Sequence, residues 1–430
     1  MKVKFYTLGC KVNQYETEYV SEIFEEEGYE IATESEDTGD VFVVNTCSVT
    51  NLSESKSRQI IRRAKRENPD SIIVVMGCYS QVAAKEVEKI EEVDIVVGTT
   101  ERNTVLDLVK RYQKSKEKIN VVRDISKDKD FQLIDIENLR GMTRAYLKVQ
   151  DGCNRYCSYC IIPYARGNIR SRDPKDVKLE VIRLSKNNYK EVVLTGIHIA
   201  SYGKDLENYE LIDLIEDIHE VEGIERIRLS SVEPRLITKE FLERLKKLPK
   251  FCDHFHLSLQ SGSNTVLERM NRKYTREEYI EKVDLIREFY PDAGITTDII
   301  VGFPGETEEE FNETLDLVKR VRFSKIHIFK YSIRKGTKAA TMKGQIDGNI
   351  KTERSKILSD LERTFRLEFM KKMVNRTLKV LVEREIDGIY YGHTTNYLEI
   401  GIKGSDIKIN QIIDVIINEV SDEKLFGYIE

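Results

Sequence analysis

Residues 145–160 read AYLKVQDGCNRYCSYC, a strand-like run that leads into three closely spaced cysteines. Cys153, Cys157 and Cys160 follow a Cys-x3-Cys-x2-Cys spacing on one short loop. Three thiolates on such a loop can bind three irons of a 4Fe–4S cube, which leaves the fourth iron open to an outside ligand. A structural zinc knuckle is the alternative, but no histidine lies nearby to complete four zinc ligands. The spacing therefore favours an iron–sulfur loop.

The same strand opens a series of six strand-like runs that alternate with helical patterns. Six such units predict a partial or full parallel barrel with its active site at the C-terminal ends of the strands. An open iron at that mouth can bind the amino and carboxylate groups of S-adenosylmethionine and pass it one electron. The predicted strands are 145–149, 191–194, 226–230, 255–259, 295–301 and 325–329.

The first 112 residues show another alternation of strands and helices. Strand–helix alternation of this kind predicts an open parallel sheet that is covered on both faces. The predicted strands are 2–8, 41–44, 72–76 and 95–97, and the predicted helices include 53–68 and a single helix through 82–90.

Three dispersed cysteines follow strands of this first sheet. Cys10, Cys47 and Cys78 each come just after a predicted strand, and the carboxyl ends of parallel strands gather at one edge of an open sheet. Gly9 and Gly77 directly precede two of them and allow tight turns toward a bulky ligand. Three convergent thiols predict a second cluster with one open iron. The alternative is three unconnected, half-buried cysteines.

The whole chain of 430 residues is long enough for about three domains. From about residue 371 the pattern changes to short strands separated by turns, which predicts a small β-barrel. Its strands are expected at 377–382, 397–402, 412–417 and 425–429. The fold class is therefore α/β, with an N-terminal sheet domain at 1–113, a charged linker at 114–138, a barrel at 139–370 and the small β-barrel at 371–430.

Composition excludes several classes of protein. The chain has 69 Lys and Arg against 74 Asp and Glu, so its net charge of −5 gives no global basic field for nucleic acid. With 40% apolar residues it is not disordered, and no apolar run approaches the ~20 residues of a membrane span. The polar start is not a signal peptide, so we expect a cytoplasmic protein. An odd count of seven cysteines argues against a disulfide framework, and Cys252, without a partner motif, is interpreted as structural.

Residues 153–172, CNRYCSYCIIPYARGNIRSR, resemble the methylthiotransferase branch of the radical S-adenosylmethionine superfamily. The segments 194–196, 230–234, 257–262, 297–306 and 331–337 extend this resemblance over essentially the whole chain. The resemblance implies an enzyme with two 4Fe–4S clusters and S-adenosylmethionine as radical source and methyl donor. In that scheme the barrel cluster on Cys153, Cys157 and Cys160 generates the 5′-deoxyadenosyl radical. The auxiliary cluster on Cys10, Cys47 and Cys78 holds or donates sulfur.

The resemblance also implies residues that contact S-adenosylmethionine at the strand ends of the barrel. Tight-turn packing is the alternative role for the glycines among them. The expected cofactor-binding residues are Tyr159, Thr195, Gly196, Glu233, Gln260, Ser261 and Gly302.

The context of the first cysteine bears on the substrate. Residues 8–16, LGCKVNQYE, resemble the branch that modifies N6-threonylcarbamoyladenosine (t6A) beside the anticodon of tRNA. This implies methylthiolation at adenine C2 of position 37 in ANN-decoding tRNA, giving ms2t6A, with an electron donor such as flavodoxin or ferredoxin. The isopentenyladenosine branch tends to read GCQMN there and the ribosomal-protein branch GCPKN, and both targets stay open. A non-catalytic iron–sulfur carrier or RNA-binding protein is the alternative from another class.

Local basic patches are the expected contacts to RNA, although solvated faces explain them as well. The terminal β-barrel resembles the TRAM domain, an RNA-binding module, and its tyrosines are either base-stacking or core residues. The patches are Lys56, Arg58, Arg62, Arg63, Lys65 and Arg66 on one helix, Arg155, Arg166, Arg170 and Arg172 around the cysteine loop, and Lys371, Lys372, Arg376, Lys379, Tyr390, Tyr391 and Tyr397 in the last block.

His198, His254 and His256 have no carboxylate or cysteine context that suggests catalysis. We interpret them as hydrogen-bonded polar positions.

Overall fold

The computed structural model describes residues 1–33, 39–133, 136 and 143–429. The chain forms two compact units. Unit 1 contains residues 1–140, 148–172 and 332–340, and unit 2 contains residues 141–147, 173–331 and 341–430. This division differs from the expected domains 1–113, 139–370 and 371–430, which stay a prediction, and the boundary expected at 138–139 lies outside the described residues.

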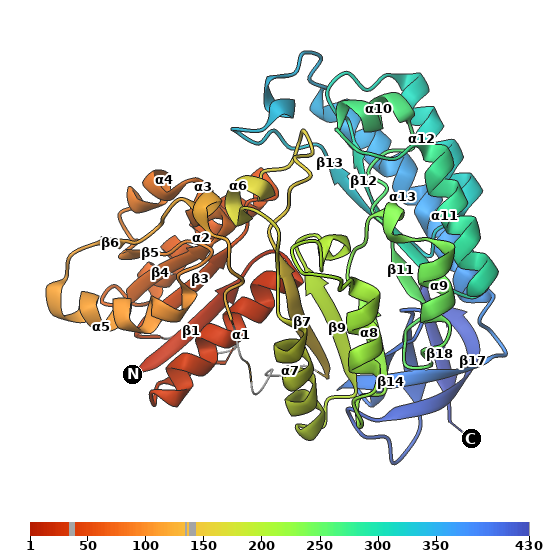
Figure 1. The fold of residues 1–430 in the computed structure, drawn as a ribbon, viewed down its shortest axis with the longest axis horizontal. Coiled ribbons are helices and arrows are strands. Elements are labelled where there is room, and N and C mark those ends of the chain that lie inside the picture. Colours follow the sequence, from red (N-terminus) through yellow and green to blue (C-terminus); the bar gives the residue numbers. More distant parts are fainter. Residues whose placement is uncertain (34–38, 134–135, 137–142, 430) are drawn as a thin grey trace. The chain divides into compact units, whose positions relative to one another are not determined.

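Unit 1 is built on a six-stranded sheet in the order β2-β1-β3-β4-β5-β6, with all neighbours parallel (Figure 1). Helices α1 and α5 pack their apolar side chains on one face, and α2, α3 and α4 cover the other. The strands are β1 Lys2–Thr7, β2 Glu30–Ile31, β3 Val41–Thr46, β4 Ile72–Gly77, β5 Ile95–Val96 and β6 Ile119–Asn120. The helices are α1 Lys11–Glu26, α2 Asn51–Glu67, α3 Cys78–Val82, α4 Ala84–Glu88 and α5 Val105–Ser115.

The predicted open parallel sheet is thus confirmed, with local differences. The single helix expected through residues 82–90 is two short helices, and the first begins at Cys78 itself. The edge strands β2 and β6 are absent from the prediction because two residues carry too little pattern to detect. Strand β6 lies inside the stretch 114–138 that was expected to be a linker.

The predicted barrel strands are all present as strands or parallel bridges. Strand β7 passes from unit 2 into unit 1, and its last residues pair with β8 in antiparallel fashion. In unit 2, β9 and β10 are parallel, as are β11, β12 and β13. The bridge between Val232 and Leu257 continues the pattern from the β10 segment to the β11 segment. The strands are β7 Arg144–Asp151, β8 Arg170–Ser171, β9 Glu191–Gly196, β10 Arg226–Leu229, β11 His254–His256, β12 Gly294–Val301 and β13 Lys325–Lys330.

Most of the remaining helices belong to unit 2. Helix α6, Ile162–Arg166, follows the cysteine loop in unit 1 and begins with Pro163 in its first turn. Capping boxes at Thr275 and Thr307 start two of the long helices. The helices of unit 2 are α7 Pro174–Lys186, α8 Leu211–His219, α9 Lys239–Leu245, α10 Asn264–Arg269, α11 Arg276–Phe289, α12 Glu308–Val321 and α13 Gly348–Lys371.

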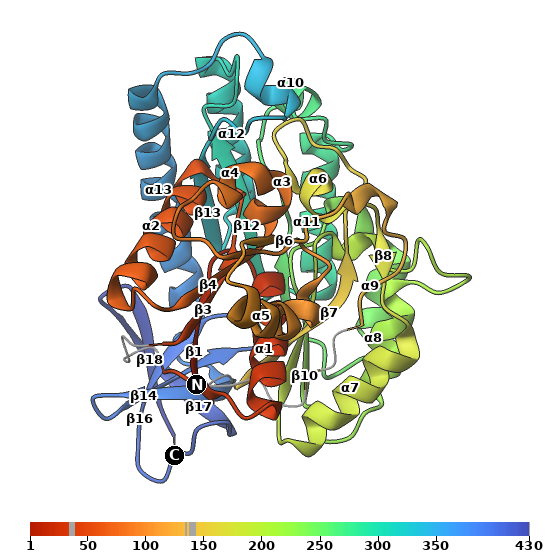
Figure 2. The ribbon, with the colours of Figure 1, turned by 90° about the vertical axis from the view of Figure 1, so that its left-hand side faces the viewer.

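The last segment of unit 2, drawn in blue in Figure 2, contains the strands of a closed barrel. Their order is β14-β15-β16-β18-β17. The predicted small β-barrel is confirmed, but one of its strands, β15, was not predicted. Arg226 and Arg228 on β10 donate hydrogen bonds to backbone carbonyls of this barrel, including Lys379 at 2.8 Å and Thr395 at 2.8 Å. The strands are β14 Thr377–Ile386, β15 Ile389–Thr394, β16 Glu399–Lys403, β17 Ile412–Ser421 and β18 Lys424–Tyr428. Among the described residues, no helix is long and apolar enough to cross a membrane.

Candidate iron–sulfur site

The ends of β1, β3 and β4 each lead directly to one of the three dispersed cysteines. Because these strands are neighbours in the sheet, Cys10, Cys47 and Cys78 leave it along the same edge. Cys47 and Cys78 are buried, and Cys10 is exposed. Burial raises the pKa of the Cys78 thiol to about 12 against the opposing effect of Arg166, and neighbouring Cys47 and Cys10 raise it further. The three thiols are therefore close enough to influence one another.

Asn13 in the first turns of α1 ties two of these strand ends together. Its side-chain amide donates to the Leu8 carbonyl at 2.8 Å and to the Thr46 carbonyl at 3.1 Å. Thr46 in turn donates from its hydroxyl to the Met76 carbonyl at 2.7 Å. These bonds join the backbone before Cys10, before Cys47 and before Cys78. The three cysteine-bearing turns are thus held by side chains as well as by the sheet.

The glycine before Cys10 has no room for a side chain. Gly9 has φ +109°, and a Cβ there would lie 2.9 Å from Cβ and 3.0 Å from Sγ of Cys47. Both the backbone conformation and the close approach require glycine.

The second group of cysteines lies on the loop after β7, also in unit 1. Cys153, Cys157 and Cys160 are half-buried and form no disulfide. Backbone N–H groups of Cys153 and Cys160 donate to the carbonyls of Gly167 at 3.0 Å and Cys157 at 2.9 Å, which folds the loop back on itself. Ala339, from the segment 332–340, donates its N–H to the Ser158 carbonyl at 2.7 Å and holds the loop from outside.

Each triad offers three thiols as candidate ligands. A 4Fe–4S cube takes each thiolate at a different iron. Three thiols and no nearby histidine are the donor set that such a cube takes. Cys252 belongs to unit 2 and is fully buried there, which agrees with a structural role.

A buried ion network lies beside the auxiliary triad, and sequence reasoning missed it. The Glu16 carboxylate accepts from Arg166 at 2.5 Å and from Lys148 at 2.7 Å, and it forms an ion pair with Arg102 at 2.9 Å. Burial opposes ionisation of Glu16, but these three cations outweigh it and lower its pKa to about 2. Asp151 accepts a further bond from Lys148 at 2.6 Å. Asn13 and Glu16 stand three and six residues after Cys10 on one helix face, and this periodicity was the available signal.

The residues expected to contact S-adenosylmethionine lie at or near strand ends. In unit 2, Thr195 and Gly196 end β9, Gln260 has φ +70° and bridges to Ile299 of β12, and Gly302 directly follows β12 with φ +71°. Ser261 is fully buried, and Tyr159 lies half-buried on the cysteine loop of unit 1. Their positions agree with the expectation, and their role stays a prediction.

All three histidines are hydrogen-bonded, as interpreted from the sequence, and two of them have carboxylate partners. His198 Nε2 lies 2.9 Å from an oxygen of Glu233, which was expected to contact the cofactor. His256 Nε2 lies 3.1 Å from an oxygen of Asp298. These partners come from other segments of the barrel, so sequence neighbours gave no sign of them. His254 and His256 both contact the Thr296 hydroxyl at 3.0 Å, as expected for two positions on one strand face.

The basic residues divide into buried and exposed groups. Arg166, Arg170 and Arg172 are at most 2% exposed, so the expectation that they contact phosphates is wrong. On α2, Lys65 donates to the Ser71 carbonyl and Arg58 to the Tyr79 hydroxyl, whereas Lys56, Arg62, Arg63 and Arg66 are exposed.

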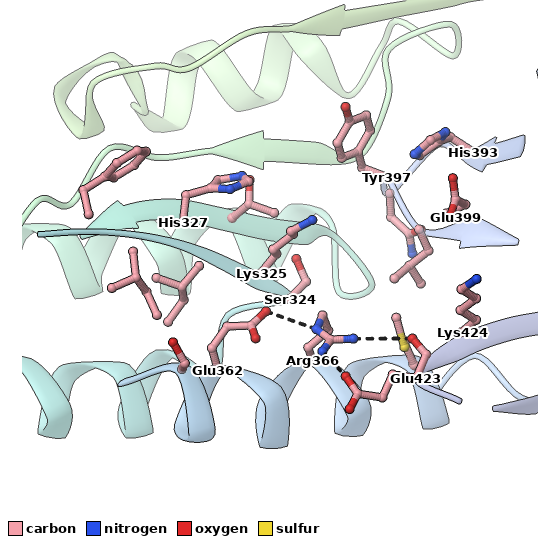
Figure 3. A pocket seen from close by; sticks show the side chains of 18 of the residues that line it. Ser324, Lys325, His327, Glu362, Arg366, His393, Tyr397, Glu399, Glu423 and Lys424 are labelled. Carbon is pink, nitrogen blue, oxygen red and sulfur yellow. Dashed lines mark hydrogen bonds and ion pairs between the residues drawn. The ribbon is translucent and has the colours of Figure 1, made fainter. Parts of the chain in front are cut away.

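A separate cavity of about 710 Å³ lies within unit 2, between β13, α13 and the C-terminal barrel (Figure 3). Arg366 lines this cavity and donates hydrogen bonds to Glu362 at 3.1 Å and to Glu423 at 2.6 Å (Figure 3). Tyr397 on its wall stacks on His254 and His393, with ring centroids 4.5 and 4.9 Å away. These contacts favour the core role for Tyr397 over base stacking. No cysteine lines the cavity, so it is not part of the iron–sulfur site.

Comparisons with known proteins agree with this geometry. Residues 147–318 match the Radical SAM superfamily model, and residues 2–98 match the model of Uncharacterized protein family UPF0004. The chain is 45% identical to a threonylcarbamoyladenosine tRNA methylthiotransferase of Bacillus subtilis, over 96% of this chain and 93% of that protein. It is 43% identical to the Aquifex aeolicus protein of the same name, over 97% and 100%.

A second kind of relative is somewhat less similar. A tRNA-2-methylthio-N6-dimethylallyladenosine synthase of Natranaerobius thermophilus is 39% identical, over 99% of this chain and 96% of that protein. Among solved structures, the radical S-adenosylmethionine methyltransferase TsrM of Kitasatospora setae, with cobalamin and a [4Fe-4S] cluster bound, is similar in fold. It has a TM-score of 0.57 at 15% identity, over 79% of this chain and 77% of that one. The chain therefore belongs to the radical S-adenosylmethionine tRNA methylthiotransferases, enzymes that work with S-adenosylmethionine and two 4Fe–4S clusters.

Proposed function

We propose that the enzyme methylthiolates C2 of the adenine in t6A at position 37 of ANN-decoding tRNA, giving ms2t6A. The observation that carries this proposal is the identity of 45% and 43% to two proteins named for threonylcarbamoyladenosine, against 39% for the dimethylallyladenosine relative. The LGCKVNQYE context of Cys10 supports the same branch.

The cysteines divide the work in this proposal. Cys153, Cys157 and Cys160 hold the cluster that, when bound, supplies the electron for cleavage of S-adenosylmethionine. Cys10, Cys47 and Cys78 hold the auxiliary cluster and leave one iron open for sulfur. The residues proposed to position S-adenosylmethionine are Thr195, Gly196, Glu233, Gln260, Ser261 and Gly302 in unit 2, with Tyr159 from the cysteine loop.

The proposal also includes partners that the chain itself does not provide. Each cleavage consumes one electron, so a one-electron donor such as flavodoxin or ferredoxin is required. We place the reaction in the cytoplasm, where tRNA is modified. Exposed cations of α2, namely Lys56, Arg62, Arg63 and Arg66, are the proposed phosphate contacts, because they remain accessible to tRNA.

Nucleoside mass spectrometry of tRNA tests the substrate. The gene is expressed in a bacterial host that makes t6A and isopentenyladenosine but lacks both methylthiotransferases. We expect the mass of ms2t6A to appear while isopentenyladenosine stays unmodified. Appearance of the methylthio-isopentenyl nucleoside alone would assign the enzyme to the other branch.

Cysteine variants test the division of labour. Cys153→Ala should abolish formation of 5′-deoxyadenosine, because two thiolates do not hold the cleaving cluster. Cys47→Ala should keep that cleavage and lose the methylthio product. Cys252→Ala is the matched control and should keep both. Methylthiolation that persists in Cys47→Ala would refute the auxiliary role.

A further inference from the structure

One arginine connects the auxiliary triad with the loop of the second triad. Arg166 ends helix α6, six residues after Cys160, and its side chain is fully buried. Its Nε donates to Sγ of Cys78 at 3.2 Å. Its two Nη atoms donate to Glu16 at 2.5 and 3.0 Å and to the Asn13 side-chain oxygen at 2.7 Å. All three guanidinium nitrogens are thereby used.

These bonds reach each of the three auxiliary cysteines. Cys78 is contacted directly. Cys10 Sγ lies 3.9 Å from the Asn13 side-chain oxygen that accepts from Arg166. The amide of Asn13 also holds the Thr46 carbonyl, next to Cys47. Arg166 is therefore linked, directly or through Asn13, to each of the three cysteine-bearing turns.

The charges around Arg166 do not balance among the side chains alone. In the described part of unit 1, the buried cations Arg102, Lys148, Arg166 and Arg170 meet only two buried carboxylates, Glu16 and Asp151. Each of these six side chains is at most 5% exposed. Each cation has a carboxylate partner, but the group has two more positive than negative charges, and this excess favours an anion close by. A cube held by three thiolates is such an anion.

We propose that Arg166 is a positioning residue that raises the reduction potential of the auxiliary cluster. A hydrogen bond to a ligand sulfur and a nearby positive charge both stabilise the reduced, more negative form of a cluster. Arg166 provides both, at Cys78. This inference rests on the proposed assignment of Cys10, Cys47 and Cys78 as cluster ligands, and it adds a residue that holds the cluster without ligating it.

The test uses the full chain with the other cluster removed. In a Cys153→Ala/Cys157→Ala/Cys160→Ala background, anaerobic reconstitution should leave about four irons per chain. The reduction potential of that cluster is then measured by EPR at a series of fixed potentials. Arg166→Gln should shift the one-electron equilibrium toward the oxidised form by about tenfold, which is a potential about 59 mV more negative.

Two further variants make the result decisive. Arg166→Lys keeps the positive charge and the pairing with Glu16 but loses the planar donor to Cys78, so it should fold and show a smaller shift in the same direction. Arg111→Gln, an exposed cation of α5, should show no shift. An unchanged potential in Arg166→Lys and Arg166→Gln, with four irons retained, would overturn the role of Arg166. Absence of iron in the triple-alanine background would instead overturn the ligand assignment, and the inference with it.

Discussion

Replacing Glu16 by glutamine removes a carboxylate that forms ion pairs with Arg102, Arg166 and Lys148 together. The side chain is fully buried, so no water can replace the lost charge. Glutamine keeps the shape and one accepting oxygen. The three cations are then left with Asp151 alone, which pairs with Lys148. The variant therefore isolates the electrostatic part of the network in unit 1.

The size of the effect follows from the pKa of Glu16. The folded protein lowers this pKa from 4.5 to about 2, which corresponds to about 3 kcal/mol of stability at neutral pH. Loss of one partner from a buried ion pair costs about 3–5 kcal/mol, in agreement. Because the folded pKa is the lower one, this stability is present above pH 4.5 and is lost as the pH falls from 4.5 to about 2.

Hydrogen–deuterium exchange of peptides from α1 measures this effect locally, which matters because a chain of several domains does not unfold in one step. We expect Glu16→Gln to lower protection of α1 about a hundredfold at pH 7, the equivalent of about 3 kcal/mol. The variant should also lose the part of the decline in stability between pH 4.5 and 2 that comes from Glu16, whereas Asp151, whose pKa is also lowered, keeps its own part. Glu27→Gln, at the exposed end of the same helix where Glu27 pairs with Lys110, should change little. Equal protection of α1 in Glu16→Gln and Glu27→Gln would refute the stabilising role of the buried Glu16 carboxylate.

Two other substitutions, one in each unit, test further features of the structure. Gly9→Ala should reduce the iron bound at the auxiliary site, because the new Cβ would lie 2.9 Å from Cβ of Cys47. Iron analysis in the Cys153→Ala/Cys157→Ala/Cys160→Ala background measures this loss. Gly28 has a similarly positive φ of +85°, but a Cβ there would meet open space. Gly28→Ala should therefore lower the free energy of unfolding by about 1–2 kcal/mol and leave the bound iron unchanged. Arg228→Met in unit 2 should destabilise by about 3–5 kcal/mol, since it leaves a buried carboxylate and barrel carbonyls without their donor. Thermal unfolding and limited proteolysis would detect this loss. Arg384→Met, which removes an exposed ion pair with Glu399, should leave the unfolding temperature and the proteolysis pattern unchanged.

The fold was largely predictable because its strands are short, apolar runs between clear helical stripes. Strand β15 was missed because its sequence, IYYGHT, has little apolar alternation and contains a glycine. That glycine, Gly392, is required by packing, since a Cβ there would lie 2.0 Å from the Leu381 carbonyl oxygen. The segment pairs with β14 directly across the two-residue turn Asp387-Gly388, so this Asp-Gly turn was the local signal that could have revealed the strand.

The convergence of the cysteines was predictable from the sequence, whereas the side chains that surround them were not. Strand ends of a parallel sheet converge by geometry, so position in the sequence is enough to bring the cysteines together. The side chains that hold them come from residues as far apart as Asn13 and Arg166, and no local pattern links those two. A buried arginine is also rare, so sequence reasoning assigned Arg166 to the surface.

The distance between Glu16 and its partners along the chain has a consequence for synthesis on the ribosome. A protein emerges from its N-terminus at about 5–20 residues per second, and its early domains begin to fold first. Glu16 leaves the tunnel long before Lys148 and Arg166, so in the nascent sheet it can pair with Arg102 but still lacks these two later cations. We therefore expect the N-terminal sheet to mature only after the cysteine loop has been translated, and a fragment that stops before that loop to be captured by chaperones.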